Sequence, residues 1–555
     1  MLRAVQPTVR FGLMFPGTTL PAWGARCLEA LVAREGVELA VRIVEDRPRA
    51  ERPPDLRWSL YWRLVVTRRS RSVRPVSVPA AFEGVPAAAA ADIAAIRGHE
   101  LDFILRFEPG TLNGDILTAA RYGVWSYSHG NERACGDGAS PGREIYAGDP
   151  VTKVTLHRLT GRAGTGIVLH EGHFCTIAGS YTRHLDRIRF GGADWPARVC
   201  ADIRNGNTAY LDGPPQTADD PGPARGRCPP MGRFFVKLLR NRARSHWREL
   251  WRADHWNVGI VDAPIGTFLN GGPIPPVNWL PEPPRGRFLA DPFAVADDGR
   301  LFIFAEEFDY RTNLGRITVV EPRTTKPPHQ VFDLKVHASY PFLFQHDGTT
   351  YCAPCISPER RGLDLFRAID VPTQWEKVAT ILPEFAAQDA TLFEHDGRWW
   401  LLATENAEPP NTKLHGWFAP APAGPWVPHP LNPLKSDVRS SRPGGTPFVH
   451  DGHLYRPAQD DSTSYGAAIV LNRVVRLSPT EFEETPVARV DPVPGRYSKG
   501  LHTLSAAGTS TLIDGKRRGF ASPAIRQQLG YRLRRVGRIP GRLLRFIRRV
   551  RPVKI

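Results

Sequence analysis

Residues 391–404 read TLFEHDGRWWLLAT, in which an apolar run leads into Asp-Gly and a second apolar run follows. This order predicts a β-hairpin, because Asp-Gly is suited to the tight turn between two strands. The Asp-Gly pair recurs at Asp298, Asp347, Asp396, Asp451 and Asp514, with spacings of 49, 49, 55 and 63 residues. Repeats of about 50 residues made of short strands are typical of β-propeller blades. Residues 256–520 are therefore predicted to form an all-β five-bladed β-propeller.

The preceding residues, 1–210, alternate strand-like and helix-like segments, for example RFGLMF, AWGARCLEALVAR and VELAVRIV. That alternation predicts an α/β domain with an open, largely parallel sheet. Residues 211–255 combine a Pro- and Gly-rich linker with a basic helix. The apolar residues of this helix are expected to pack against a neighbouring domain rather than a membrane. They are Phe235, Leu238, Leu239, Trp247, Leu250 and Trp251.

The formal net charge of +17 is concentrated partly at the C-terminus, where residues 515–555 contain no acidic residue. Within 521–555, leucines, valine and isoleucine alternate with arginines, which predicts a basic amphipathic tail able to lie on an anionic membrane surface. An inert solvated tail is the alternative. No recognised nucleic-acid-binding module accompanies the tail, so no specific nucleic-acid partner is predicted.

The opening residues lack the continuous apolar core of a secretory signal, and no run of about 18 apolar residues predicts a membrane span. Seven cysteines, an odd number, do not indicate a disulfide framework. Cys352 and Cys355 have the spacing of half a zinc site, but no second ligand pair completes it. We therefore expect a cytoplasmic protein, peripheral at the inner membrane face through its tail, with no metal and no cofactor.

Candidate site residues occupy a comparable position ahead of each Asp-Gly pair, so the repeat should bring them together around the propeller axis. They are Asp291, Tyr340, Asp389, Arg442 and His502. Two aspartates from different blades suit acid–base chemistry on a sugar. The alternative for Asp291 is a turn cap before Pro292.

The motifs ADPF…DDGRLFIFAEE, SYPFLFQHDG and QDATLFEHDGRWWLLAT resemble the five-bladed propellers of glycoside hydrolase families 43 and 32. With YRPAQDDSTSYG and GLHTL, residues 256–520 more closely resemble the N-terminal domain of plant glucosamine inositolphosphorylceramide transferases and their bacterial relatives. The family 43 resemblance implies that Asp291 is the base and Asp389 the orienting residue. The usual setting of the general acid reads SRPGGTP, without a carboxylate, and Cys355 stands where relatives of this propeller commonly carry Glu.

A missing acid favours sugar transfer over hydrolysis, since a phosphate or nucleotide diphosphate leaves without a proton but benefits from positive charge. Arg442 and Arg456 could supply that charge through bidentate contacts. The alternative for both arginines is structural pairing with Asp460 or Asp461. A displaced acid also stays open, with Asp460, Glu306 and Glu307 as the candidates.

Residues 95–180 resemble the Rossmann-like formyltransferase fold, through LDFILRFEPGTLNGDILTAARYGVWSYSHGN and the segment that follows it. Active members carry Asn-x-His and a later Asp. Here Ser126 and Ser128 stand at the first motif, and Gly164 replaces the Asp. This departure implies a degenerate formyltransferase-like domain, with His129 and Asn131 as the residual candidate site.

The favoured hypothesis is a glycosyltransferase-type protein of bacterial surface polysaccharide or glycolipid biosynthesis, acting at the propeller mouth. Its substrate would be a carbohydrate or sugar phosphate bound by Tyr340, Arg442, Arg456, Asp460 and His502. Three alternatives remain: a family 43-like glycoside hydrolase, a sugar N-formyltransferase, and a non-catalytic carbohydrate-binding scaffold.

Overall fold

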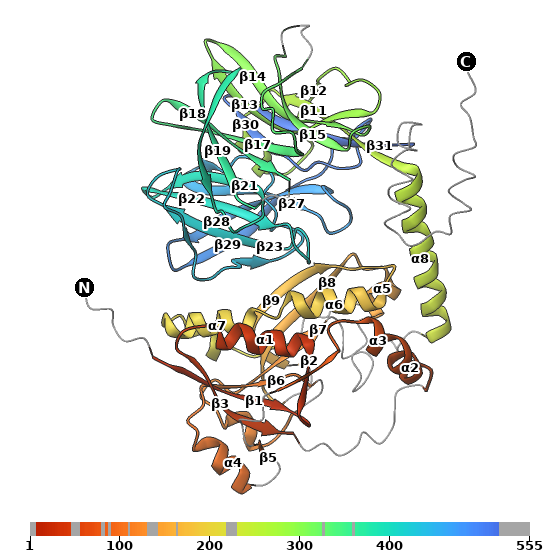
Figure 1. The fold of residues 1–555 in the computed structure, drawn as a ribbon, viewed down its shortest axis with the longest axis vertical. Coiled ribbons are helices and arrows are strands. Elements are labelled where there is room, and N and C mark those ends of the chain that lie inside the picture. Colours follow the sequence, from red (N-terminus) through yellow and green to blue (C-terminus); the bar gives the residue numbers. More distant parts are fainter. Residues whose placement is uncertain are drawn as a thin grey trace.

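The computed structural model describes residues 7–45, 56–78, 84–86, 90–108, 112–129, 142–161, 165–217, 230–322, 324, 328–357 and 361–520. They form two lobes, an N-terminal lobe of helices around a sheet and a second lobe made almost entirely of strands (Figure 1). Asn131, Gly164 and the tail 521–555 lie outside the described residues.

The N-terminal lobe is built on an eight-stranded mixed sheet. Its parallel part runs in the order β5 (Gly84–Pro86), β3 (Val37–Val44), β1 (Val9–Phe15), β6 (Phe103–Arg106) and β7 (Val124–His129). The antiparallel strands β8 (Val151–Leu159), β9 (Thr165–Cys175) and β10 (Gln216–Thr217) extend it beyond β7. A separate two-stranded sheet pairs β2 (Thr19–Pro21) with β4 (Pro75–Ser77). The parallel strand pairs expected from the alternating sequence are thus present.

Side chains of β1 pack into two cores, one on each face of this sheet. Phe11 and Leu13 belong to one core and Met14 to the other, because successive residues of a strand point to opposite faces. The longer helices are α1 (Ala22–Val32), α4 (Ala90–Arg97), α6 (Tyr181–Gly191) and α7 (Trp195–Arg204). The short ones are α2 (Leu56–Tyr61), η1 (Trp62–Val66), α3 (Thr67–Arg69), η2 (Asp115–Thr118), α5 (Gly142–Ala147) and η4 (Ala209–Asp212).

The second lobe contains five sheets within the described residues 252–520, which confirms the five-bladed propeller. The first blade consists of β13 (Arg287–Asp297), β14 (Arg300–Asp309), β15 (Leu314–Val320) and β16 (His329–Gln330). The second consists of β17 (Ala338–His346), β18 (Thr349–Ile356), β19 (Leu363–Asp370) and β20 (Gln374–Ile381). The third consists of β21 (Ala387–His395), β22 (Arg398–Glu405), β23 (Lys413–Ala419) and β24 (Val427–Pro428), with β25 (Lys435–Ser436) beside β23. The fourth is β26 (Phe448–His450), β27 (His453–Asp460), β28 (Ala468–Leu477) and β29 (Phe482–Val490).

The fifth blade joins the two ends of the propeller. It is ordered β12 (Val277–Trp279), β11 (Arg252–Val261), β31 (Ser510–Phe520) and β30 (Leu504–Ala507), and the 3-10 helix η5 (Ile265–Asn270) follows β11. The antiparallel ladder between β11 and β31 runs from Arg252↔Phe520 to Val261↔Thr511. Closing the ring in this way gives each blade sheet a neighbouring blade on both of its faces.

Four of the five Asp-Gly pairs form the hairpin turns that the repeat predicts. Asp298, Asp347, Asp396 and Asp451 lie in these turns with positive φ angles of 46°, 48°, 50° and 48°. The prediction is wrong for Asp514, which lies inside β31 opposite Val258 and is fully buried. The turn of that hairpin is at Gly508, whose φ is +64°. The Asp514 carboxylate instead accepts hydrogen bonds from backbone amides inside the propeller.

The lobes contact each other through α7 and β9. Arg198 Nη1 donates to the carbonyls of Leu431 and Pro433, at 2.8 Å each. The amide of Val438 donates to the carbonyl of His173 at 2.9 Å. Because residues 437–441 lead directly into Arg442, this contact helps to fix the loop that carries one of the candidate site residues.

The basic helix expected after the linker is α8 (Met231–Trp251), which runs along one side of the molecule to β11 (Figure 1). Its packing prediction holds for Leu238, which is partly buried against the N-terminal lobe. It is wrong for Leu239 and Trp247, which are 64% and 49% exposed. The residue that anchors the helix is Phe234, which is fully buried. Among the described helices, none has the length and apolar content needed to cross a lipid bilayer.

Candidate active site at the propeller axis

Asp291, Tyr340 and Asp389 occupy equivalent positions in three successive blades, as the repeat predicts. Each lies at a bulge in the first strand of its blade, where the register with the second strand shifts. Their φ angles are 51°, 45° and 52°. This left-handed conformation is tolerated by Asp but is a true outlier for a bulky residue such as Tyr. Backbone outliers of this kind occur at functional sites more often than elsewhere.

A chain of side-chain-to-backbone hydrogen bonds links neighbouring blades around the axis. Asp514 Oδ2 accepts from the amide of Asp291 at 3.2 Å, and Asp291 Oδ2 accepts from the amide of Tyr340, also at 3.2 Å. The Tyr340 hydroxyl lies 3.1 Å from Thr391 Oγ1 in the third blade. These bonds hold the strained bulges in place, so the axial side chains are fixed by the blades themselves.

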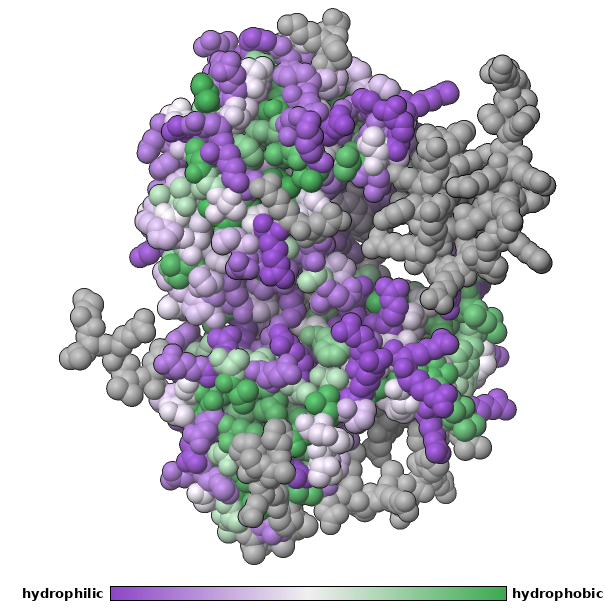
Figure 2. Space-filling model, viewed as in Figure 1, coloured by the Kyte–Doolittle hydropathy of each residue, from purple (hydrophilic) through white to green (hydrophobic). Residues whose placement is uncertain are grey.

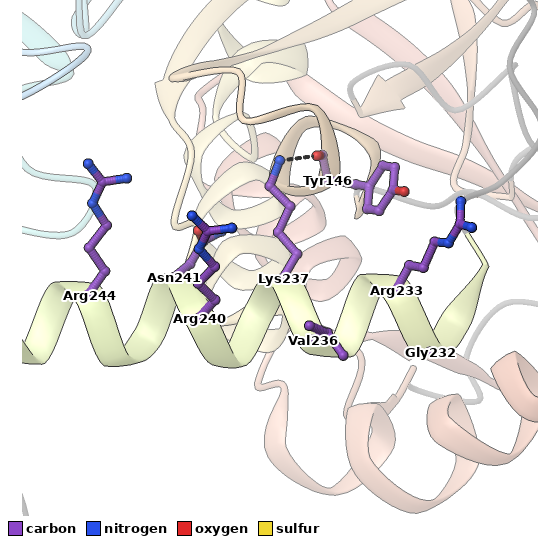
Figure 3. Close-up of a pocket in the computed structure, with 8 residues that line it drawn as sticks. All are labelled: Tyr146, Gly232, Arg233, Val236, Lys237, Arg240, Asn241 and Arg244. Carbon is purple, nitrogen blue, oxygen red and sulfur yellow. Dashed lines mark hydrogen bonds between the residues drawn. The ribbon is translucent and has the colours of Figure 1, made fainter.

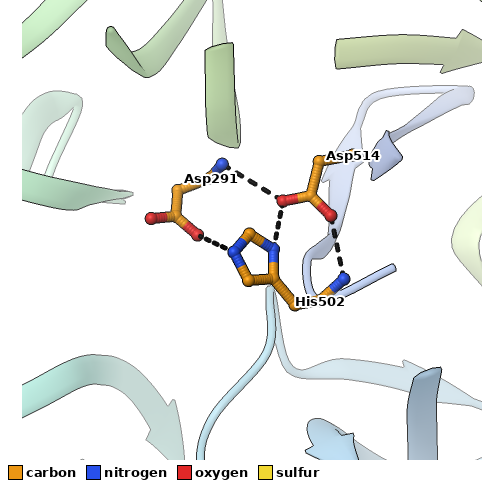
Figure 4. A group of neighbouring side chains, drawn as sticks. All are labelled: Asp291, His502 and Asp514. Carbon is orange, nitrogen blue, oxygen red and sulfur yellow. Dashed lines mark hydrogen bonds and ion pairs between the residues drawn. The ribbon is translucent and has the colours of Figure 1, made fainter. Parts of the chain in front are cut away.

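Figure 4 shows the innermost group, in which His502 lies between Asp514 and Asp291. His502 Nδ1 bonds the Asp514 carboxylate, and its Nε2 lies 3.7 Å from Asp291 Oδ1. Thr503 Oγ1 donates to the same Asp291 oxygen at 3.0 Å. The imidazole stacks on Trp256 with ring centroids 3.9 Å apart. Burial opposes protonation of His502, but Asp514 and Asp291 outweigh it and raise the pKa of the imidazole.

Asp389 is held by two donors from the fourth blade. Arg442 donates to it through Nε at 2.6 Å and Nη2 at 3.2 Å, and Gln459 Nε2 donates at 2.7 Å. Arg442 also donates to Asn411 at 2.8 Å, and its guanidinium lies over the Tyr465 ring, 5.1 Å from the centroid. The side chain of Arg442 is 12% exposed, whereas that of Asp389 is 2% exposed. The Arg442 guanidinium therefore lies at the edge of the axial cluster, whereas the Asp389 carboxylate lies inside it.

Two further carboxyls have pKa values shifted towards the protonated form. Burial raises the pKa of Asp291 to about 6, against the lowering effect of His502 and with smaller raising effects from Asp389 and Asp514. Burial, followed by the nearby charges of Asp291 and Asp389, raises the pKa of Glu306 well above its ordinary value. Glu306 lies on β14 opposite Ala290, one residue before Asp291. Of the three candidates for a displaced acid, Glu306 is the one that joins the axial cluster.

The space beside Glu306 depends on Gly315 in β15. A Cβ at that position would lie 2.1 Å from Glu306 Oε1 and 2.8 Å from the backbone carbonyl oxygen of Ala338. We expect Gly315→Ala to displace the Glu306 carboxyl and to lower the free energy of unfolding by about 1–3 kcal/mol, which is typical of overpacking. Thermal unfolding measures this loss. The control is Gly232→Ala, where a Cβ meets nothing within 4 Å; equal stability of both variants would contradict the prediction.

Two other predicted site residues have structural partners. Arg456, which is 1% exposed, makes a bidentate ion pair with Glu484 and donates to the carbonyls of Ser440 and Ser441. Each of its guanidinium nitrogens is therefore engaged, and the prediction that it binds phosphate is wrong. The alternative prediction, that Arg456 pairs with Asp460 or Asp461, is also wrong, because its partner is Glu484. Asp460 bonds Arg489 instead, and Glu307 pairs with Arg287 at 3.1 Å.

The residual candidate in the N-terminal lobe, His129, lies inside an aromatic cluster. Its ring stacks on Tyr127 with centroids 5.5 Å apart and meets Trp23 edge-on at 5.1 Å. The residue is 4% exposed. Asn131, its predicted companion, lies outside the described residues. The described part of this lobe therefore places His129 in the packing of the domain.

The sequence patterns did not single out four parts of the cluster, Gln459, Thr503, Trp256 and Tyr465, and they assigned a fifth, Asp514, to a hairpin turn. Asp514 was misassigned because an Asp-Gly pair inside a strand looks the same in sequence as one in a turn. Trp256 is at the start of the fifth blade, and only ring closure brings it to His502. Its position could have been inferred from the pairing of the first and last propeller strands.

Asp291, His502 and Asp514 also have the residue types of a metal site, and their potential ligand atoms lie within 4.8 Å of one another. However, Asp514 Oδ1 already accepts from the amides of His502 and Thr503, and its Oδ2 accepts from Asp291 and the imidazole. A cation here would have to displace hydrogen bonds that hold the axis together. The donor set fits a hydrogen-bonded proton-sharing group better than a metal site.

The fold and site together define a five-bladed propeller with a buried carboxyl cluster at its axis. Residues 283–499 match the family model described as glucosamine inositolphosphorylceramide transferase 1, N-terminal. The glucosamine inositolphosphorylceramide transferase 1 of Arabidopsis thaliana is 32% identical over 251 residues, which cover 43% of this chain and 31% of the plant protein. The protein of that name from Oryza sativa subsp. japonica is 34% identical over 211 residues, covering 36% and 28%.

This chain thus spans about a third of the length of the plant relatives that it matches. These relatives give no support to the bacterial setting expected from the sequence. Among solved structures, the family 117 glycoside hydrolase Zg3597 of Zobellia galactanivorans shares 14% identity, with a TM-score of 0.31 over 42% of this chain and 85% of the hydrolase. The RS223 β-xylosidase shares 11% identity, with a TM-score of 0.30 over 37% of this chain and 77% of that enzyme.

Proposed function

We propose that the axial cluster is an acid–base site that acts on a sugar, and that it serves glycosyl transfer in glycolipid synthesis. The observation that carries this proposal is the gathering of Asp291, Asp389 and Glu306 from two blades around one axis. Buried carboxyls with raised pKa values are a common feature of sites that transfer protons. The names of the plant relatives, which denote a transferase acting with glucosamine and inositolphosphorylceramide, support a glycolipid substrate.

Asp291 is the proposed general base that takes the proton from the acceptor hydroxyl. A carboxyl with a pKa of about 6 can be ionised at neutral pH and is still a stronger base than an ordinary aspartate. His502 and Thr503 orient it, since both approach Oδ1. Tyr465, which is 41% exposed, offers an aromatic face to the sugar at the entrance to the cluster.

Asp389 and Arg442 are proposed to orient the donor sugar and to balance the charge of its leaving group. Because Arg442 is already paired with Asp389, it would act as a fixed cation rather than as a mobile phosphate ligand. A fixed positive charge stabilises a departing phosphate without reorganisation in the transition state. This role replaces the two-arginine phosphate site that the sequence suggested.

Hydrolysis of a glycoside is the second candidate, and Glu306 is the observation that favours it. A glycosidase must protonate its leaving group, so it needs a carboxyl that stays protonated near neutral pH. The raised pKa of Glu306 meets this requirement. Measuring the rate of sugar release to water against transfer to a lipid acceptor distinguishes the two functions.

The proposed base predicts a pH dependence. Ionised Asp291 predominates only above about pH 6, so the rate at limiting substrate concentration should fall as the pH drops through that value. The raised pKa of Asp291 also affects folding. The stability that Asp291 contributes is present below about pH 4 and is lost as the pH rises through about 6. A pH–rate profile measures the first effect; an acidic limb centred near pH 4 would contradict the assignment.

For the N-terminal lobe we propose a formyltransferase-like fold that has become a support for the propeller. The burial of His129 among Trp23 and Tyr127 argues against a role in proton transfer. The contacts of β9 and α7 with residues 431–438 fit a supporting role, because they brace the loop leading to Arg442. A cytoplasmic location and the lipid-binding tail remain predictions.

A further inference from the structure

Helix α8 presents an apolar face to solvent. Val236, Leu239 and Trp247 are 67%, 64% and 49% exposed. Their spacing of three and eight residues places them along one side of the helix, whereas Phe234 and Leu238 pack inwards. Figure 2 shows hydrophobic residues, interspersed with hydrophilic ones, at the lower end of the side where α8 lies. An exposed apolar stripe of this kind marks an interaction surface.

The segment from α2 to α3 extends this surface. Two ring contacts join it to α8: Tyr61 lies 4.9 Å from Phe235, and Trp58 lies 5.2 Å from Phe234. Leu60 and Leu64, four residues apart and hence on one face, are 48% and 52% exposed. The two elements therefore share an apolar core and each leaves further apolar side chains in solvent.

The charge of both segments is almost entirely positive. Helix α8 carries one acidic residue, Glu249, and six basic residues: Arg233, Lys237, Arg240, Arg242, Arg244 and Arg248. Residues 56–78 carry no acidic residue and six arginines: Arg57, Arg63, Arg68, Arg69, Arg71 and Arg74. Arginines thus flank the exposed apolar side chains in both segments.

A groove of about 890 Å³ lies between α8 and α5 and is lined by several of these basic residues. Figure 3 shows Arg233, Lys237, Arg240 and Arg244 extending from the same side of the helix. Lys237 Nζ donates to the carbonyl of Tyr146 at 2.5 Å, which anchors the middle of the groove. Its dimensions and charge suit a negatively charged headgroup.

We propose that α8 and the α2–α3 segment form a docking surface for an anionic lipid membrane. In this arrangement the apolar side chains enter the boundary between headgroups and acyl chains, and the arginines contact lipid phosphates. A protein partner would need a matching acidic and apolar face, whereas an anionic bilayer offers both features over any area. The inference concerns a surface other than the propeller axis and does not depend on the proposed chemistry.

Sedimentation of the full chain with vesicles tests the proposal. The protein should bind vesicles of phosphatidylcholine with phosphatidylserine and should bind pure phosphatidylcholine at least about tenfold less, because the basic residues need anionic lipid. The double variant Val236→Ser/Leu239→Ser should lose roughly tenfold or more of the binding, since both side chains are exposed and apolar. Arg240→Glu/Arg244→Glu should do the same and should also reduce the sensitivity to salt.

The matched control is Val449→Ser/Val487→Ser, which alters two exposed propeller residues, 66% and 46% exposed, and should bind as the wild type does. A fourth variant, Arg545→Gln/Arg548→Gln/Arg549→Gln, reports on the basic tail. Three results would overturn the proposal: no binding by the wild type, loss of binding in the tail variant alone, or equal binding to both lipids. Self-association that the Val236→Ser/Leu239→Ser variant abolishes, without vesicle binding, would assign the surface to a second copy instead. Circular dichroism melting verifies that every variant is folded.

Discussion

Asp291→Asn is expected to lower the rate of sugar transfer or hydrolysis by about 100- to 10,000-fold, the usual contribution of a general base. Asparagine retains the size of the side chain and tolerates the positive φ angle of 51° at this bulge. It cannot accept a proton, and its amide nitrogen cannot accept from Thr503 or from the Tyr340 amide as a carboxylate oxygen does. The variant should therefore lose activity through the missing base, and the lost hydrogen bond should also lower the free energy of unfolding by about 1–3 kcal/mol.

The matched control for this variant is Asp298→Asn in the same blade. Asp298 also has a positive φ angle, 46°, but it lies in the hairpin turn away from the axial cluster. Steady-state rates of both variants, with melting temperatures, separate the two effects. A rate for Asp291→Asn within a few-fold of the wild type would remove Asp291 from the chemistry, as would an equal loss in the control.

Glu484→Gln is expected to cause the largest loss of stability, about 3–5 kcal/mol in the free energy of unfolding. Glu484 is buried between Arg456 and Lys435, with bonds of 2.9 and 2.6 Å to the guanidinium and 2.9 Å to Nζ. Despite the opposing effect of burial, these two cations lower the pKa of Glu484 to about 2. A neutral glutamine would leave both cations buried without a counter-charge.

The same pair gives a pH signature. Because the pKa of Glu484 is lower in the folded protein than in the unfolded chain, its stabilisation is present above about pH 4.5 and is lost as pH falls towards 2. Urea unfolding at neutral and acidic pH measures this, and the variant should lose less stability than the wild type on acidification. Glu376→Gln, which breaks a largely exposed pair with Arg367, serves as the control and should change little. Equal stability of Glu484→Gln and the control would contradict the account.

The repeat in the sequence predicts much of the propeller and part of its site. Four Asp-Gly turns and the equivalent positions of Asp291, Tyr340 and Asp389 follow from a period near 49 residues, because each blade repeats the same strand register. Asp514 breaks the pattern, since its carboxylate is used inside β31 rather than in a turn.

Ion-pair partners were harder to predict than strand positions. Arg456 and Glu484 lie in different strands of one blade, and their sequence separation gives no sign that they meet. Asp460 is close to Arg456 in sequence, but it bonds Arg489 on β29, across the intervening strand β28. Side-chain pairing of this kind depends on three-dimensional register, which hydrophobic periodicity alone does not specify.

The most direct test of the sugar site is a thermal-shift measurement with nucleotide sugars, free pyranoses and furanoses, inositol phosphate and folate derivatives. It compares the wild type with Asp291→Asn and Arg442→Gln, because a ligand that binds only the folded state raises the melting temperature. The account predicts that a sugar or sugar phosphate stabilises the wild type and that both substitutions reduce this shift. Stabilisation by a folate derivative alone, unchanged in both variants, would contradict it and move the activity to the N-terminal lobe.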